Sequence, residues 1–509
     1  MWSDAQRAPH GLDDLVNYAA LIAPGVLLGK DGSLLTAWHF RGPDLEYASP
    51  EEIERLSAQV SAAFTRCSDG WMLHLDLLRL PVTEYLPPGA FPDPTTALID
   101  EERRRAFHRM GQHFRTVAAL TLTYCPPPDR EQRLTALLYT GVRATQARAD
   151  LVVEGFRHTV TEVEDVLGSV LHLARMNDTE LLTYLHYCVT GIDRQVPVPS
   201  VPVDLDSVIA DQDLIGGFTP QIGEQHVRVI SLDGYPRMTE PGAQAFLHEL
   251  PMPYHWSTRF VVLDRREAER LLYTTRKHWW QKRATFIQKL ADAGSGGSTL
   301  PLPQEDALEM AADANTAAAE AASGEVIFGL YTMTVIVMDE DEARVDEMAR
   351  DVQKQVQRHG FGARIERANA LEALIGSWPG HGYQNVRRVP LHSLNLADLL
   401  PLTSVWTGEA MNPNPYCPPA SPALMLTATT GQSHFFLNLH VSDLGHTIVV
   451  GPTASGKSTL LGMLAAQWRR YPGAQVFWFD KGASSFVLCQ AVGGQHYDIG
   501  GDHTPVAFC

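Results

Sequence analysis

The feature that most constrains this chain is a glycine-rich segment near its end. Residues 451–458 read GPTASGKS and match the pattern G-x-x-x-x-G-K-[ST] at every fixed position. The apolar run HTIVV precedes this segment, and STLLGMLAAQWRRY follows it with helical spacing and two arginines near its end. Strand, loop, helix is the order in which such a loop binds phosphate. We therefore predict a buried strand, a phosphate-binding loop and a helix from Thr459 to Arg470.

Each residue type in the loop has a chemical reason. Glycines let the backbone curl so that N–H groups face phosphate oxygens, and the positive end of the next helix faces the same anion. Lys457 would reach the β and γ phosphates of a nucleotide, and the Ser458 hydroxyl would hold Mg²⁺. These two residues are the predicted catalytic residues, with Ser458 as the metal ligand. A chance match in an ordinary turn is the alternative, expected in roughly one or two chains of this size per hundred at average glycine usage.

A second strand and a short helix are expected after the first helix. AQVFWFD reads as a buried strand that ends at Asp480, and KGASSFVLCQAVGG reads as the helix. An Asp at the carboxyl end of a parallel strand faces the ligand crevice, but a turn-forming role in Asp-Lys-Gly is equally open. The predicted nucleotide-binding residues are Gly451, Pro452, Thr453, Ala454, Ser455, Gly456, Lys457, Ser458, Thr459 and Asp480.

Composition narrows the class of protein. With 509 residues, 45% hydrophobic and 20% charged, the chain fits a soluble globular protein of about three domains. No stretch reaches the roughly 18 apolar residues that span a bilayer. The six cysteines form no CxxC pair, which argues against a zinc site or disulfides and favours a reducing cytosol. A net charge of −18 disfavours non-specific DNA binding. It does not exclude a local patch of basic residues.

The residues before the loop indicate α/β organisation. Strands are expected within 25–40, 70–81, 116–128, 227–232, 256–264, 325–338 and 361–367, and helices within 49–64, 150–190, 305–322 and 339–360. We also expect a solvated helix over residues 101–112, and the acidic run at residues 339–342 is expected to start a helix. The β-α-β order favours a parallel or mixed sheet. Residues 276–290 combine basic and aromatic residues, and this pattern favours a helix on a domain core over partner or membrane docking.

The residues around the loop resemble a known family. NLHVSDLGHT at 438–447, the loop itself, Asp480-Lys481-Gly482 and the Gly493-Gly494 turn are similar to the TrbE/CagE-type ATPases of conjugal transfer and type IV secretion. The segment GSWPGHGYQNVRRVPLHSLNLADLLPLTSVWTGE resembles the end of that family's N-terminal domain. The strong resemblance covers about a quarter of the chain, and residues before about 370 match more loosely.

The resemblance implies a fold and a function. The implied fold class is α/β, a long N-terminal α/β domain followed by the start of a RecA-like P-loop NTPase domain that is truncated at the C-terminus. We place the domains at 1–195, at 196–400 with a flexible loop near 291–303, and at 401–509. Walker B acids, the catalytic glutamate and any arginine finger are expected beyond Cys509, since residues 451–509 are too few for such a motor.

The implied function is that of an ATP hydrolase with ATP and Mg²⁺ as cofactors. It would act at the cytoplasmic, peripheral face of the bacterial inner membrane and power pilus biogenesis or substrate transfer. The implied partners are inner-membrane components of the secretion system and further copies of the chain in a hexamer. A non-hydrolysing docking subunit and a DNA-pumping coupling ATPase are the alternatives, and DNA binding is left open.

Overall fold

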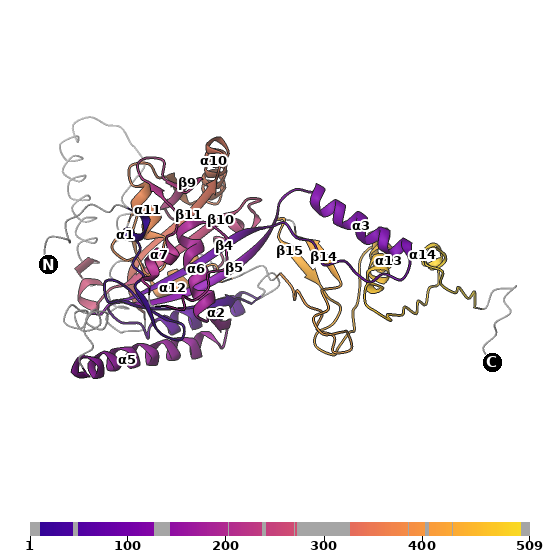
Figure 1. Cartoon of the computed structure of the whole chain (residues 1–509), viewed down its shortest axis with the longest axis horizontal. Helices are drawn as coiled ribbons and strands as arrows, with labels where there is room; N and C mark the ends of the chain where they lie inside the picture. Colours follow the sequence, from indigo (N-terminus) through magenta and orange to yellow (C-terminus); the bar gives the residue numbers. More distant parts are fainter. Residues whose placement is uncertain are drawn as a thin grey trace, which may run out of the picture. The chain divides into compact units, whose positions relative to one another are not determined.

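The computed structural model describes residues 11–43, 49–126, 143–201, 203–236, 241–268, 270–271, 326–384, 386–402, 407–429 and 431–499. The chain divides into two compact units (Figure 1). Unit 1 comprises Met1–Leu80 and Val117–Ser404, and unit 2 comprises Pro81–Thr116 and Val405–Cys509. The domain division predicted at residue 195 stays a prediction.

Unit 1 is built on one large sheet, which has 13 strands among the described residues. The main path runs β1-β2-β3-β5-β4-β10-β11-β9-β8-β7, while β6 pairs with β3, β12 with β9 and β13 with β11. In chain order the strands are β1 (Ala20–Ala23), β2 (Val26–Leu28), β3 (Leu34–Arg41), β4 (Trp71–Val82), β5 (His113–Tyr124), β6 (His172–Arg175), β7 (Leu214–Ile215), β8 (Gln221–Ile222), β9 (Gln225–Gly234), β10 (Tyr254–Val262), β11 (Phe328–Asp339), β12 (Gly362–Ile365) and β13 (Val389–His392).

The expectation of a parallel or mixed sheet is wrong. Strand β10 is antiparallel to both β4 and β11, and the pairs β9–β11, β9–β12 and β3–β5 are antiparallel as well. The β-α-β order is present, and it is compatible with an antiparallel sheet. In each case a third strand lies between the two strands that a helix joins. Strand β9 separates β11 from β12, and β5 separates β3 from β4. In such split units the neighbours in the sheet are antiparallel although the sequence order is β-α-β.

Helices cover both faces of this sheet. The helices of unit 1 are α1 (Leu12–Leu15), α2 (Pro50–Phe64), α5 (Arg143–Leu167), α6 (Asp178–Thr190), α7 (Leu205–Ile209), the short 3₁₀ helix η2 (Ala245–Glu249), α10 (Glu342–Arg358), α11 (Ala370–Gly376) and α12 (Ser393–Leu399). Helices α2, α5, α10 and α12 share one apolar core with the first face, called here the α2 face. Helices α1, α6, α7 and α11 share a second core with the other face, called the α6 face. Unit 1 is therefore a three-layer α/β structure.

Capping residues in the sequence correctly predicted where several helices begin. Ser49 accepts a hydrogen bond from the Glu52 N–H, and the Glu52 side chain accepts one from the Ser49 N–H, which is the capping box that starts α2. Asp341 caps α10, so the acidic run at residues 339–342 does start a helix. The helical pattern expected over 150–190 is interrupted, because α5 ends at Leu167 and β6 pairs with β3 before α6 begins.

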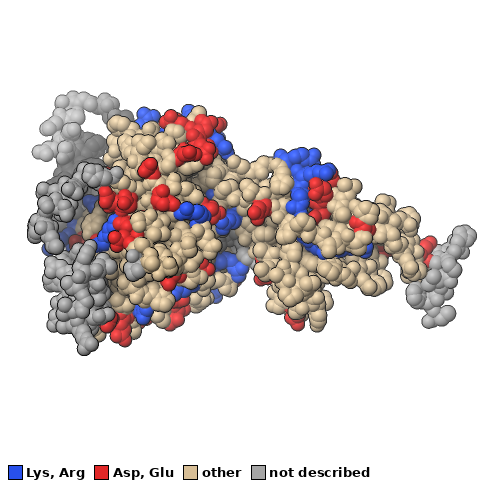
Figure 2. All heavy atoms as spheres, viewed as in Figure 1, with Lys and Arg blue, Asp and Glu red and all other residues tan. Residues whose placement is uncertain are grey.

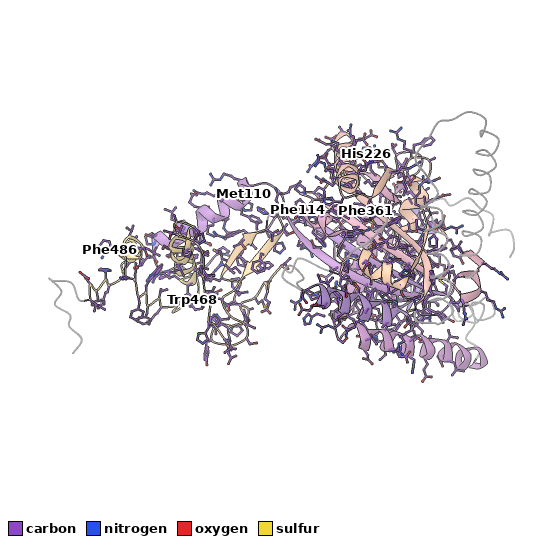
Figure 3. The ribbon with its side chains drawn as sticks, turned by 180° about the vertical axis from the view of Figure 1, so that it is seen from behind. Met110, Phe114, His226, Phe361, Trp468 and Phe486 are labelled. Atoms are coloured by element: carbon purple, nitrogen blue, oxygen red, sulfur yellow. The ribbon has the colours of Figure 1, made fainter. Side chains whose placement is uncertain are left out.

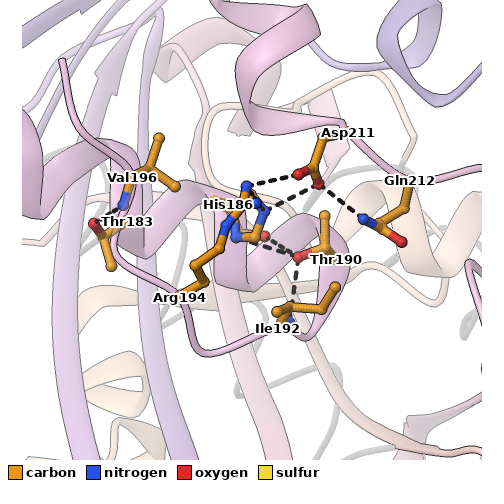
Figure 4. Close-up of polar contacts among 8 residues, drawn as sticks. All are labelled: Thr183, His186, Thr190, Ile192, Arg194, Val196, Asp211 and Gln212. Carbon is orange, nitrogen blue, oxygen red and sulfur yellow. Dashed lines mark hydrogen bonds and ion pairs between the residues drawn. The ribbon is translucent and has the colours of Figure 1, made fainter. Parts of the chain in front are cut away.

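The end of α6 is fixed to Asp211, which lies just after α7 (Figure 4). The buried ring of His186 lies 3.1 Å from Asp211, measured from Nε2 to Oδ1, and Arg194 donates to the other carboxylate oxygen of Asp211 at 2.6 Å. Gly191 then ends the helix in the left-handed conformation, with φ of 74°. Burial lowers the pKa of His186, while Asp211 opposes this shift. These contacts join the C-terminal end of α6 to the segment that follows α7.

Unit 2 contains fewer elements. They are α3 (Pro94–Arg109), the antiparallel hairpin of β14 (Met425–Ala428) and β15 (His434–Leu437), α13 (Lys457–Trp468) and α14 (Phe486–Ala491). One small core joins Tyr85, Leu86 and Phe107 to Leu426 of β14 and to Ala423 just before that strand. A second core joins the hairpin to Leu464 and Tyr471. The hairpin thus packs both against the segment 81–116 and against α13.

Three expectations for unit 2 are wrong. Residues 446–450 and 474–480 form no strand, and Ile448, Val450, Phe477 and Phe479 are exposed. Strands are stable only beside others, and no described strand lies next to these segments. The helix expected over 101–112 begins earlier, at Pro94, and it is not wholly solvated because Thr96, Asp100 and Phe107 are buried.

Some expectations concern residues outside the described ones. These are the basic and aromatic segment at 276–290, the flexible loop near 291–303 and the helix expected over 305–322.

Candidate nucleotide-binding site

The glycine-rich loop runs directly into α13. Gly456 precedes the helix with φ of 88°, and Ala454 also has a positive φ, of 64°. The left-handed conformation is open to glycine at no steric cost, which explains why a glycine stands immediately before the lysine. The loop and the first turn of α13 are mostly exposed to solvent. The helix occupies residues 457–468, close to the predicted range.

The start of α13 offers unpaired hydrogen-bond donors. The first helical bond runs from the Leu460 N–H to the Gly456 carbonyl, and the N–H groups of residues 456–459 have no partner among the described residues. This is the ordinary state of a helix N-terminus. Together with the helix dipole, these donors make the position suited to an anion. The backbone therefore fits a phosphate group.

The side chain of Lys457 is folded back onto the loop. Its Nζ donates to the Gly451 carbonyl at 2.9 Å and to the Pro452 carbonyl at 2.5 Å. The ammonium group is thus held at the carbonyls of the first two loop residues, which are neutral acceptors instead of a carboxylate. An anion with several oxygens could replace these two carbonyls as the partner of the ammonium group.

Asp480 lies in a turn after the second apolar segment. Its Oδ1 accepts a hydrogen bond from the Gly482 N–H, and its Oδ2 accepts from the Ser485 N–H and from the hydroxyls of Ser484 and Ser485. These hydrogen bonds lower the pKa of Asp480 to about 2, and the one from the Gly482 N–H has the largest effect. The carboxylate is thus charged and orders the turn before α14. If Asp480 bound a metal ion or a water molecule, it would use the carboxylate lone pairs that these hydrogen bonds leave free.

Residues of the segment 438–447 hold the hairpin and the end of α13. The Asn438 side chain accepts from the Leu424 N–H and donates to the Glu409 carbonyl. The ring of His440 stacks on Trp468, the last residue of α13 and labelled in Figure 3, with centroids 5.8 Å apart. A Cβ added at Gly445 would lie 2.4 Å from His440 Nε2, so a larger residue there would push the His440 ring aside. The segment thus connects the hairpin to the C-terminal end of α13.

Two arginines after α13 contact the inserted segment 81–116, which sequence reasoning missed. Arg469 Nε lies 3.0 Å from Asp93, the residue that caps α3. Arg470 is buried and donates to the carbonyls of Ala423, Leu424 and Pro87. The paired arginines at the end of the helix were visible in the sequence. Their acceptors lie about fifty and four hundred residues earlier, so no local pattern could identify them.

Charges are interspersed on the visible face of the molecule. In Figure 2, acidic and basic side chains lie side by side instead of forming one continuous basic tract. On α3, Arg105 lies 3.1 Å from Glu101 and 2.7 Å from Glu102, so much of the arginine charge there is matched by neighbouring acids. Among the described residues, no helix has both the length and the apolar character that a membrane crossing requires.

Two family models match the chain. The model described as the N-terminal domain of the type IV secretion system ATPase VirB4/TrbE matches residues 25–132. The model described as the CagE, TrbE, VirB family, component of type IV transporter system, matches residues 303–387. The conjugal transfer protein TrbE of Rhizobium radiobacter is 42% identical over 96% of this chain. A probable conjugal transfer protein TrbE of Sinorhizobium fredii is 41% identical over 372 residues, 70% of this chain and 55% of that protein.

The chain belongs to the TrbE/VirB4 family of type IV secretion ATPases.

More distant members extend the comparison. The type IV secretion system protein virB4 of Bartonella henselae is 22% identical over 95% of this chain. The chain spans about 60% of its long relatives, namely 61% of the Rhizobium protein and 60% of the Bartonella protein. The family resemblance noted around the phosphate loop is therefore confirmed, and it extends over nearly the whole chain.

Proposed function

We propose that the whole protein binds and hydrolyses ATP in a conjugation or type IV secretion machine. The observation that carries this proposal is the loop at residues 451–458. Its backbone leads into the unpaired donors of α13, and Lys457 folds back onto the carbonyls of its first two residues. Family membership supports the same activity. ATP hydrolysis would power pilus biogenesis or substrate transfer.

The residues of the loop would have separate roles. The N–H groups at the start of α13 would bind phosphate oxygens, and Lys457 would leave the carbonyls of Gly451 and Pro452 to reach the β and γ phosphates. The Ser458 hydroxyl would hold Mg²⁺, which supplies charge neutralisation on the phosphates. The loop residues at 451–459 would position the nucleotide, and Asp480 would lie near it. Most of the catalytic effect would come from orientation and electrostatics.

We further propose peripheral association with the cytoplasmic side of the inner membrane. Relatives named as type IV secretion proteins and as conjugal transfer proteins support partners within such machinery. Assembly into a hexamer is proposed on the same family ground. Unit 1, with its large sheet and separate cores, is the part we assign to docking on the machine.

One substitution tests the motor role. In the full-length protein, Lys457→Ala removes the ammonium group that would contact the β and γ phosphates, so ATP turnover and DNA or protein transfer should both be lost. Lys354→Ala is the matched control, because Lys354 lies exposed on α10 in unit 1 and pairs only with Asp351 at 3.4 Å among the described residues. Normal turnover by the Lys457→Ala protein would refute hydrolysis at this loop. Loss of turnover with normal transfer would instead favour the docking function.

A further inference from the structure

The α6 face of the sheet in unit 1 carries buried polar side chains. Asp76 and His74 lie on β4, and their antiparallel partners on β10 are Ser257 and Arg259. All four residues are almost fully buried. The α2 face of the same strands is apolar, with Leu73, Leu75 and Leu77 on β4. A buried polar strip on one face of an otherwise apolar sheet requires partners that compensate for lost water.

Asp76 is the acidic group of this strip, and it is fully buried. Its Oδ1 accepts from His255 Nε2 at 2.7 Å, and its Oδ2 accepts from the Tyr184 hydroxyl at 2.6 Å. Thr121 lies 3.0 Å from the same hydroxyl, so it donates to Tyr184 in turn. One hydroxyl and one imidazole thus contact the carboxylate, and Thr121 holds that hydroxyl in place.

Cys188 completes the group. It follows Tyr184 by one helical turn on α6 and is fully buried. One ligand atom each of Asp76, Cys188 and His255 lies within 4.8 Å of the other two. Burial, with Asp76 as a second cause, raises the pKa of the Cys188 thiol well above its ordinary value.

Three ligand types converge here from three elements: an oxygen from β4, a nitrogen from β10 and a sulfur from α6. Mixed oxygen, nitrogen and sulfur ligands suit zinc, whereas magnesium and calcium prefer oxygen alone. Tyr184 already orients the second oxygen of Asp76, which is the kind of outer contact that supports a metal ligand. Liganding atoms around tetrahedral zinc lie roughly 3.3 Å apart. His255 and Asp76 would therefore separate slightly as the ion replaces their shared proton.

We propose that Asp76, Cys188 and His255 bind one zinc ion in the interior of unit 1. The ion would replace the protons on Cys188 and between His255 and Asp76, and it would join α6 to strands β4 and β10. These three residues would leave the fourth tetrahedral position to a water molecule. The site is independent of the nucleotide loop, which lies in unit 2. The sequence expectation against zinc rested on the absence of a CxxC pair, and this site needs none because its single cysteine meets ligands from distant strands.

The test measures metal in the full chain, purified without a histidine tag from cells grown with added zinc. Elemental analysis should find about one zinc per chain. Growth with cobalt in place of zinc should give the absorption band of a thiolate bound to cobalt. Cys188→Ser should lower the zinc content to less than about a tenth of an equivalent and abolish that band. Cys67→Ser is the matched control, because Cys67 is equally buried but belongs to the core of the α2 face.

Two outcomes would overturn the proposal. The first is a folded wild-type chain that contains no zinc and gives no cobalt–thiolate band. The second is a Cys188→Ser chain that keeps its zinc. Should Cys188→Ser fail to fold, the wild-type chain decides alone: removal of metal by a chelator should lower its melting temperature, and zinc but not magnesium should restore it. No change in melting temperature on chelation would count against the site. None of these measurements depends on ATP turnover.

Discussion

At the scale of single residues, His381 shows how burial sets a pH dependence. Its ring is buried beside Tyr18 and Trp378, and the Asn17 N–H donates to Nε2 at 3.0 Å, while Nδ1 lies 3.3 Å from the Pro379 carbonyl. Nε2 must therefore be unprotonated. Burial lowers the pKa of His381 to about 4, and nearby Arg259 acts in the same direction, whereas Asp31 and the carbonyls of Pro379 and Leu15 oppose the shift.

The sign of the stability change follows from this pKa. Because the folded-state pKa lies below the ordinary value of 6.5, the contribution of His381 is fully present above pH 6.5 and is lost as the pH falls toward 4. Between pH 7 and pH 5 this group alone should cost about 2 kcal/mol of unfolding free energy. In urea denaturation, His381→Gln should be less stable than wild type at pH 7 but should lose about 2 kcal/mol less on acidification. Parallel pH profiles for the two proteins would contradict this assignment.

Gly456 supports a second prediction at this scale. Its φ of 88° strains any residue with a Cβ by roughly 1 kcal/mol, although an added Cβ would meet no other atom within 4 Å. In the full-length protein, Gly456→Ala should weaken ATP binding by about five- to tenfold as measured by equilibrium dialysis. Gly462→Ala is the control, because Gly462 lies inside α13, also with open space around it, and alanine favours a helix. Equal affinity for Gly456→Ala and wild type would show that the loop conformation does not matter for binding.

At the scale of elements, the sequence reveals features that depend on residues within one element. It does not reveal features that depend on residues far away in the chain. The capping box of α2, the acidic start of α10, the hairpin of β2 and β3 and the helix after the phosphate loop were all predictable, since each signal lies within the element. The antiparallel order of the sheet was not predictable. It depends on β5 and β9 entering between strands that a helix joins, and no local pattern reveals that insertion.

Arg470 gives the prediction that belongs to this scale. Its guanidinium group joins the end of α13 to the hairpin and to the segment 81–116, and burial lowers its pKa. Arg470→Ala would leave three carbonyls without this donor, at a cost of at least about 3 kcal/mol. Hydrogen exchange in α13 and in α3 should therefore speed up together by about a hundredfold.

Arg469→Ala is the control for this experiment. Its side chain is partly exposed and forms a single ion pair with Asp93 among the described residues, so about 1 kcal/mol is expected. Faster exchange in α13 alone, with α3 unchanged, would show that the inserted segment is not held through Arg470.

At the scale of the whole molecule, the arrangement of the chain was only partly accessible from sequence. The phosphate loop and the family resemblance around it were readable because their residues are contiguous. The division of the chain into two units was not readable from the sequence. Unit 2 includes residues 81–116, which lie in the chain between two strands of the large sheet. The apolar segments at 446–450 and 474–480 have the composition of buried strands, but composition shows what could be buried and not whether a neighbouring strand is present.

The central claim is that the loop at 451–458 binds the triphosphate of ATP through the N–H groups of α13 and the Lys457 ammonium group. Equilibrium binding of ATP with Mg²⁺ to the full-length protein tests it most directly, with Lys457→Ala and Lys354→Ala measured beside wild type. Loss of a buried or charge-assisted phosphate contact predicts at least about a hundredfold weaker binding for Lys457→Ala and unchanged binding for Lys354→Ala. Equal affinity of Lys457→Ala and wild type would contradict the claim.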